Sequence, residues 1–219
     1  MNIIEVDLSL ADNGGSLAFY RDRLQLPVDG GLVQIGETTL RLHPDRRAEG
    51  TAHLAFDIPA GRFRAARDWL AARVPLIADD AGETEFEGPG HWNSRSIYFD
   101  GGGGEILELI ARRDRPAPAA EGDFSSRELL SISEVGVAVD NPAIVAGELR
   151  RLGIEPYGAP VPGFAPCGDV WGLLILVAPE RPWFLSRGRL PGTSSLRVRA
   201  RTGHPGAFAL RALAELTTV

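Results

Sequence analysis

The sequence predicts an α+β fold made of repeated units, each with one strand, one helix and then shorter strands (βαβββ). Three observations predict it. Three segments alternate with period two like strands, a segment with helical spacing follows each, and short strands bounded by Gly, Pro and Asp follow each helix. We expect each sheet to curl with its helix on the convex face. With 219 residues, 44% of them hydrophobic, the chain is long enough to bury a sizeable core.

The first unit begins with an alternating strand over residues 3–10. Asn13 is expected to cap a helix over 16–24, because Asn is a favoured N-cap residue and an apolar stripe with helical spacing follows it. Short strands are expected at 31–35 and 38–42. The second unit repeats this order.

In the second unit, a strand is expected over residues 51–58 and a helix over 61–73, where apolar residues recur at helical spacing. Strands at 95–99 and 105–110 complete the unit. The third unit has a strand over 132–139. Its helix should begin at Asn141-Pro142, a cap residue followed by Pro at the first helical position.

The division into segments follows from composition. Residues 1–113 are expected to form a domain of two paired units, 114–127 a linker rich in Pro and Ala, and 128–219 a third unit with a C-terminal extension. If the first two units pair, the third has no evident partner. It can then pack against the tail, where 194–199 resembles a further strand, or against a second subunit in a homodimer.

Composition also excludes several classes of protein. The net charge is −6 and no Lys/Arg cluster occurs, so nucleic acid is not expected as a partner. A single cysteine, Cys167, forms neither an internal disulfide nor a Cys-rich zinc site. No signal-peptide pattern and no apolar stretch of membrane-spanning length is present, so we expect a soluble, cytoplasmic protein without membrane partners.

Several weak motifs occur in the order found in one known family. Residues 16–28, 52–58, 96–100 and 106–109 resemble the vicinal oxygen chelate superfamily, which includes glyoxalase I, extradiol dioxygenases and bleomycin-resistance proteins. Residues 129–183 resemble a further half-domain of it. The resemblance implies that two βαβββ modules pair into an incomplete barrel. Its concave interior would hold a divalent metal that substrates chelate through adjacent oxygens.

The resemblance implies metal ligands on the first and last strands of the paired modules. Alignment of the first two repeats gives Glu5 and His53 on the first strands, and Arg41 and Glu108 on the last strands. Glu5, His53 and Glu108 would suit Fe(II), Mn(II), Ni(II) or Zn(II). Arg41 stands where glyoxalase-like sites carry a second Glu, and a guanidinium cannot ligate a cation. The alternative is a metal-free hollow in which Arg41 pairs with Glu108 or Glu5.

Other residues are candidates for weaker reasons. Trp92 and Asn93 lie in a loop before a strand, where family members often contact substrate, and Tyr98 can point inward as a donor. With Arg41 they form the candidate substrate-binding set. Glu134 matches Glu5 in the third repeat. The strand expected to face it offers no ligand, however, so we expect the third unit to be structural.

Two functions from different classes remain open. The first is a metal-dependent lyase, isomerase or ring-cleaving dioxygenase acting on a small substrate with vicinal oxygens, with Glu5 and Glu108 as catalytic residues. The second is a metal-free protein that binds or sequesters a drug or metabolite, with Trp92, Tyr98 and Phe56 as stacking walls. A vestigial cavity whose third unit serves dimerisation is a third alternative.

Overall fold

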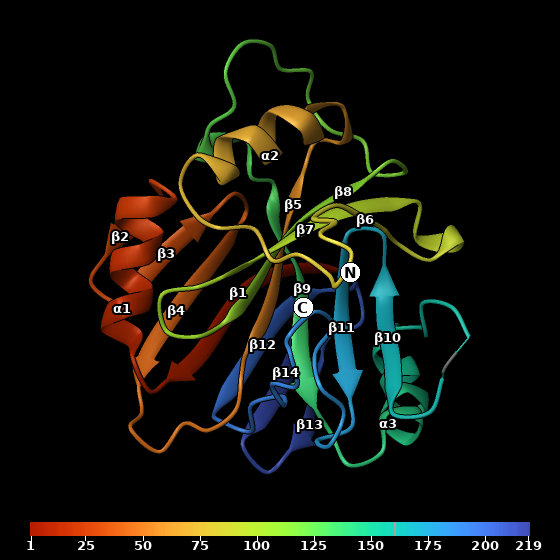
Figure 1. The fold of residues 1–219 in the computed structure, drawn as a ribbon. Helices are drawn as coiled ribbons and strands as arrows, with labels where there is room; N and C mark the ends of the chain where they lie inside the picture. Colours follow the sequence, from red (N-terminus) through yellow and green to blue (C-terminus); the bar gives the residue numbers. More distant parts are fainter. Residues whose placement is uncertain (160) are drawn as a thin grey trace.

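A computed structural model describes residues 1–159 and 161–219 and shows two curled seven-stranded sheets (Figure 1). One large hydrophobic core takes residues from both sheets, among them Val6 and Leu40 from one and Leu54 and Phe56 from the other. The α+β class expected from the repeats is therefore confirmed. The core lies between the sheets, so each sheet has one face turned toward the other sheet and one turned away.

The first sheet joins the beginning of the chain to its end. It contains β1 (Asn2–Leu10), β2 (Val28–Asp29), β3 (Leu32–Ile35), β4 (Thr38–Pro44), β12 (Leu196–Arg201), β13 (Gly206–Arg211) and β14 (Ala214–Thr218). The strand order is β13-β14-β12-β1-β4-β3-β2. β1 pairs in parallel with β4 and antiparallel with β12.

The second sheet comes from one continuous stretch of chain. It contains β5 (His53–Ile58), β6 (Phe86–Glu87), β7 (Ser94–Asp100), β8 (Ile106–Arg112), β9 (Ser131–Ala138), β10 (Phe164–Asp169) and β11 (Gly172–Val177). The strand order is β10-β11-β9-β5-β8-β7-β6. β5 pairs in parallel with β8 and antiparallel with β9.

The pairing of the units differs from the expectation. The second unit pairs with the third, and the first unit pairs with the tail, so the expected pairing of the first two units is wrong. The free edge of β5 is taken by β9, and the free edge of β1 is taken by β12. Each first strand offers the same kind of edge, so the repeats reveal the units but not which two of them meet.

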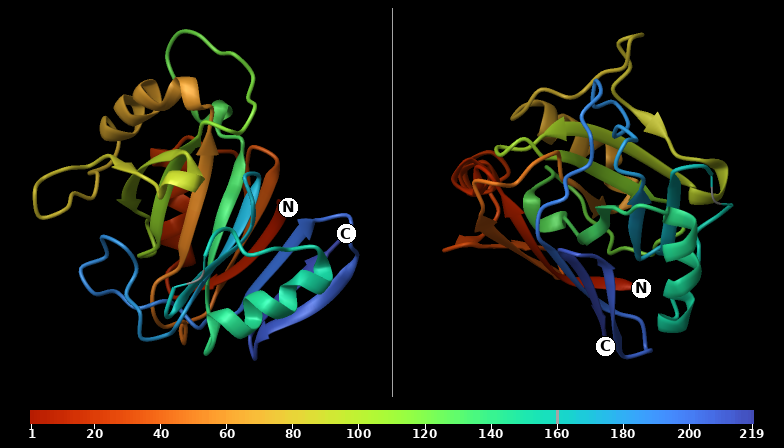
Figure 2. Two further views of the ribbon diagram at one scale, coloured as in Figure 1. Left: turned by 90° about the vertical axis from the view of Figure 1, so that its right-hand side faces the viewer. Right: turned by 90° about the horizontal axis from the view of Figure 1, so that it is seen from below.

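Side chains cap the first turn of two of the helices. α3 (Pro142–Leu149) has the expected cap, because the side chain of Asn141 accepts a hydrogen bond from the backbone N–H of Ile144. α1 (Asn13–Ala18) is capped one residue earlier than expected, by Asp12. α2 (Phe63–Ala71) buries an apolar stripe. α2 and α3 lie at opposite ends of the second sheet (Figures 1 and 2).

The outward faces of the two sheets differ in exposure. β12 alternates strictly between buried and exposed residues, so the first sheet turns a polar face to solvent. β5, β8 and β11 are buried along their whole length. Loops therefore cover the outward face of the second sheet. None of the helices in the described ranges has the length and apolar character that a bilayer span requires.

Candidate functional site

Three titratable side chains converge on the outward, hollow face of the second sheet. Ala55 on β5 has Glu108 as its neighbour on β8 and Glu134 as its neighbour on β9. His53 lies two residues before Ala55 and shares its face. The methyl group of Ala55 is small, so both glutamates reach over it toward the imidazole.

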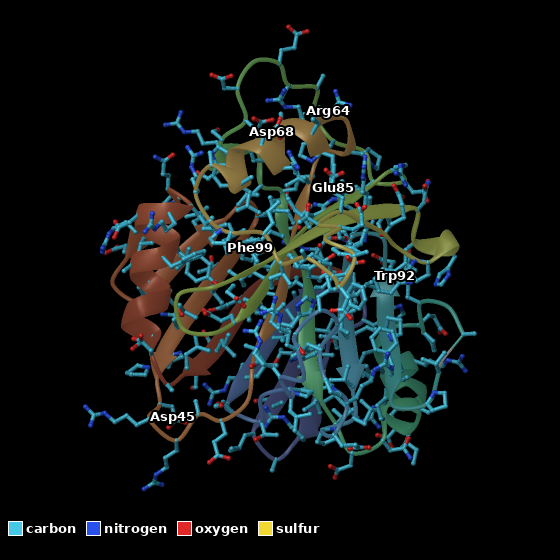
Figure 3. The ribbon with its side chains drawn as sticks, in the orientation of Figure 1. Asp45, Arg64, Asp68, Glu85, Trp92 and Phe99 are labelled. Atoms are coloured by element: carbon cyan, nitrogen blue, oxygen red, sulfur yellow. The ribbon has the colours of Figure 1, made fainter. Side chains whose placement is uncertain are left out.

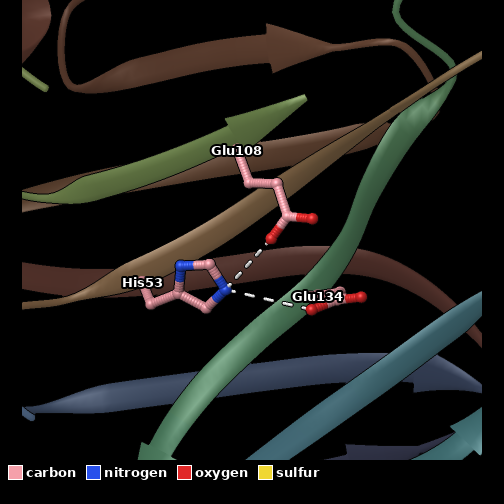
Figure 4. Close-up of side chains that lie close together, drawn as sticks. All are labelled: His53, Glu108 and Glu134. Carbon is pink, nitrogen blue, oxygen red and sulfur yellow. Dashed lines mark ion pairs between the residues drawn. The ribbon is translucent and has the colours of Figure 1, made fainter. Parts of the chain in front are cut away.

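The three groups are oriented toward a common point (Figure 4). His53 Nε2 lies 3.6 Å from Glu108 Oε2 and 3.8 Å from Glu134 Oε2, and all three ligand atoms lie within 4.8 Å of one another. His53 Nδ1 lies 3.2 Å from the carbonyl oxygen of Ile106 and donates its proton there. When the imidazole is neutral, Nε2 is therefore an acceptor, and it faces two carboxylate oxygens beyond hydrogen-bond distance.

Burial shifts the proton affinities of this group. Burial and, to a smaller extent, the neighbouring Glu134 carboxylate raise the pKa of Glu108 to about 7, although His53 opposes the rise. Burial alone would lower the pKa of His53, but Glu134 and Glu108 outweigh it and the pKa is raised. The cluster therefore holds protons near neutral pH that a bound cation would displace.

The residues present fit a divalent metal. Two carboxylate oxygens and one imidazole nitrogen suit the divalent ions of the first transition row. Both His53 and Glu134 have the outer partners that orient metal ligands: the Ile106 carbonyl for His53 and the Arg112 guanidinium for Glu134. The third unit has Ile175 on β11 at the position that Glu108 has on β8. Glu108 lies two residues after Ile106, the neighbour of His53, and Ile175 lies two residues after Leu173, the neighbour of Glu134. An apolar residue there leaves further coordination positions for substrate or water.

A cavity of about 660 Å³ opens over the three residues. Its walls carry six aromatic side chains: Phe86, Trp92, Tyr98, Phe164, Trp183 and Phe184. Figure 3 shows two of its lining residues, Glu85 and Trp92, on the same side of the molecule, whereas Asp45 lies on the loop after β4, away from them. A mostly apolar cavity with convergent polar groups at its base is the usual form of a small-molecule site.

Trp183 closes the cavity next to the imidazole. It lies on the connection between β11 and β12, and its ring centroid is 5.1 Å from that of His53. Its Nε1 donates to the carbonyl oxygen of Thr51 at 2.8 Å. The adjacent Phe184 is 59% exposed and makes edge contacts with Phe86 and Tyr98, so it lies at the mouth of the cavity.

Gly136 on β9 makes room for that indole. A Cβ atom there would lie 2.4 Å from Trp183 Cη2 and 3.1 Å from the Cβ of His53. We therefore expect Gly136→Ala to lower the free energy of unfolding by about 1–3 kcal/mol, the usual range for overpacking. Denaturant unfolding followed by tryptophan fluorescence measures it. Gly147→Ala is the matched control: nothing lies near its Cβ position, so it should cost no stability.

Of the four candidate substrate-binding residues, Trp92 and Tyr98 line the cavity, whereas Asn93 and Arg41 do not. Asn93 instead ends a short 3-10 turn with a positive φ of 44°, and its Nδ2 donates to Asp114 at 2.9 Å. Its side chain is therefore used in the loop rather than in the cavity.

Glu5 and Arg41 lie on the first sheet, away from His53 and Glu108. Arg41 Nε donates to Asp7 at 3.0 Å, and its Nη2 lies 3.5 Å from Glu5 Oε1. The expected convergence of all four residues in one hollow is therefore wrong, because β1 and β5 belong to different sheets. Arg41 pairs with Glu5, as the metal-free alternative allowed, but not with Glu108.

The first sheet carries the inverse of the charge pattern in the second. Asp7 on β1 has Arg41 as its neighbour on β4 and Arg197 as its neighbour on β12. This row of two guanidiniums around one carboxylate stands where the second sheet has Glu108 and Glu134 around Ala55. The first sheet therefore offers a metal ion no matching set of ligands.

Sequence reasoning missed three residues of the site. Glu134 matches Glu5 in the repeat, but the strand expected to face it offers no ligand, so the third unit was expected to be structural. Arg112 carried no signal beyond lying two residues past Ile110 on the same strand face. Trp183 lies between predicted elements, and nothing in its local pattern points to His53.

Comparisons with known proteins agree with the repeat structure. No family model matches the chain, and no curated protein matches it. Among solved structures, a "putative dioxygenase" from Bacillus subtilis subsp. subtilis str. 168 has a TM-score of 0.62 at 18% identity, covering 100% of this chain and 85% of that one. Glyoxalase I from Zea mays has a TM-score of 0.54 at 12% identity, covering 90% and 74%. The chain therefore shares the fold of these solved structures, which include a "putative dioxygenase" and glyoxalase I.

Proposed function

We propose that His53, Glu108 and Glu134 hold a divalent cation and that the cavity above them takes a small substrate with two adjacent oxygens. The observation that carries this proposal is the geometry of the three side chains. They are buried acceptors aimed at one another at 3.6–3.8 Å, and the Nδ1 hydrogen bond of His53 fixes its tautomer. Buried acceptors this close together need a proton or a cation between them, and a divalent cation can take the place of the protons that the cluster holds near neutral pH.

The charges of the site favour a substrate that loses one proton on binding. Besides the two glutamates, the buried groups include the Asp57 carboxylate and the Arg112 and Arg115 guanidiniums. Three carboxylates against two guanidiniums leave one negative charge when His53 is neutral. A divalent cation changes this to one positive charge, which a single ionised substrate oxygen neutralises.

The proposed chemistry is lyase, isomerase or ring-cleaving dioxygenase chemistry. A bound ion supplies Lewis-acid polarisation of the substrate oxygens. The aromatic walls exclude water and hold a flat apolar substrate, while Tyr98 lies beside Glu108 across β7 and β8 and can donate a hydrogen bond to substrate. Consumption of O₂ with a panel of catechols, measured with an oxygen electrode, separates the dioxygenase from the lyase and isomerase.

Cation binding is the primary test. Untagged protein treated with a chelator is titrated calorimetrically with Fe(II), Mn(II), Ni(II) and Zn(II), with oxygen excluded. We expect one equivalent of at least one cation to bind. Glu5→Gln is the control, and it should bind the same cation with unchanged affinity because Glu5 lies on the other sheet. Failure of all four cations to bind would contradict the proposal.

The second candidate function is sequestration of an aromatic or cationic compound without a metal. The observation that favours it is the set of six aromatic side chains in the cavity wall. Quenching of tryptophan fluorescence by such compounds in chelator-treated protein tests it, since Trp92 and Trp183 both face the cavity.

A further inference from the structure

Arg112 has a fully buried guanidinium that contacts Glu134, one of the three candidate metal ligands. It is the last residue of β8 and does not line the cavity. Its Nη2 donates to Glu134 Oε1, and its Nη1 donates to Ser133 Oγ at 2.8 Å. The fork of one guanidinium therefore holds two consecutive side chains of β9.

The guanidinium of Arg112 also forms an ion pair with a second carboxylate, that of Asp57. Asp57 on β5 lies between β8 and β9, with its Oδ1 3.8 Å from Arg112 Nη1. Asp57 Oδ2 accepts from Arg115 Nη1, which also donates to Ser131 Oγ at 3.0 Å. Buried charges that are paired in this way keep one geometry, because movement of either partner would leave an uncompensated charge.

The two oxygens of Glu134 therefore have different surroundings. Oε1 is occupied by Arg112, whereas Oε2 faces His53 Nε2. A carboxylate held in this way can give one oxygen to an ion but cannot turn to give both.

We propose that Arg112 is a positioning residue that restricts Glu134 to single-oxygen coordination and so keeps a coordination position open for substrate. This inference rests on the proposed metal site. The competing explanation is that Arg112 only stabilises the fold by bridging β8 and β9 across β5. That explanation predicts a loss of stability and no change in how the cation binds.

Arg112→Lys tests the inference with the charge kept. An ammonium group is a single, more flexible donor site, so it does not reproduce the fixed fork on Ser133 and Glu134. We expect cation affinity to fall by about 10- to 100-fold, as is usual when an outer partner of a ligand is lost. Calorimetric titration of wild type and variant with the same cation measures this.

Arg115→Lys is the matched control. Arg115 is also buried and pairs with Asp57, but it contacts none of the three ligands. Its variant should lose stability and keep the cation affinity of the wild type. A loss of affinity as large as that of Arg112→Lys would assign both arginines to the fold alone and overturn the inference.

An infrared measurement on the wild type does not depend on whether a variant folds. The separation between the antisymmetric and symmetric carboxylate stretches is wide for single-oxygen coordination and narrow for chelation by both oxygens. Difference spectra with and without cation, assigned with Glu134→Gln, should show the wide separation for Glu134. A narrow separation overturns the inference, as does equal affinity in Arg112→Lys and wild type. A wild type that binds no cation instead overturns the proposed function itself.

Discussion

Glu108→Gln should lower the affinity of the protein for its divalent cation by more than tenfold. The substitution keeps the shape of the side chain but replaces a charged oxygen ligand by a neutral amide. The sequence predicted that Arg41 lies near Glu108, but Arg41 lies on the other sheet and pairs with Asp7. The substitution therefore does not leave Arg41 without its ion-pair partner. Titration of the untagged variant with the cation that the wild type binds gives the ratio of dissociation constants.

Glu105→Gln provides the control for that measurement. Glu105 is also a buried glutamate, three residues earlier in the chain, but its carboxylate accepts from Ser16 Oγ and the backbone N–H of Gly103. This variant should bind the cation like the wild type. Equal cation affinity in Glu108→Gln and the wild type would remove Glu108 from the ligand set.

The stability of the chelator-treated protein should fall as pH rises from about 4.5 to above 7. Burial raises the pKa of Glu108 from 4.5 in the unfolded chain to about 7 in the folded one. Between these values the folded state holds a proton that the unfolded state has lost. The stabilisation is therefore complete below pH 4.5 and is lost as pH passes 7. The raised pKa of His53 acts in the same direction.

Glu108→Gln should remove most of this pH dependence, because an amide does not titrate. At pH 8 without cation, the variant should be more stable than the wild type by on the order of 3 kcal/mol, the equivalent of the pKa shift. Adding cation should reverse the order, since it stabilises the wild type alone. Urea unfolding at several pH values, with and without cation, measures both effects. A wild type whose stability does not change between pH 5 and 8 would contradict the prediction.

Local structure was predictable from the sequence because its causes are local. Alternation identified the strands that became β1, β5 and β9, and the Asn141-Pro142 cap identified the start of α3. Alignment of the repeats also led to His53 on the first strand and Glu108 on the last strand of the second unit. β13 and β14 went unnoticed, because the chain after 194–199 carries no further unit with a helix.

The choice of partner strand was not predictable, because it depends on contacts between segments far apart in the chain. Glu5, His53 and Glu134 occupy equivalent positions in three repeats, and any two of the units that carry them have compatible edges. Only the completed core selects β9 as the neighbour of β5. Glu134 therefore lies in the site and Glu5 does not, because strand pairing over long distances in the chain, and no local pattern, brings β9 next to β5.

The order in which the strands of the two sheets occur along the chain also affects how the protein folds during synthesis. All strands of the second sheet lie between residues 53 and 177, so a ribosome releases them before β12 exists. β1 must meanwhile wait with one edge unpaired, and closing so long a loop is slow. During synthesis the half that carries His53 should assemble first, and the interval before β12 emerges is when the nascent chain is most exposed to aggregation.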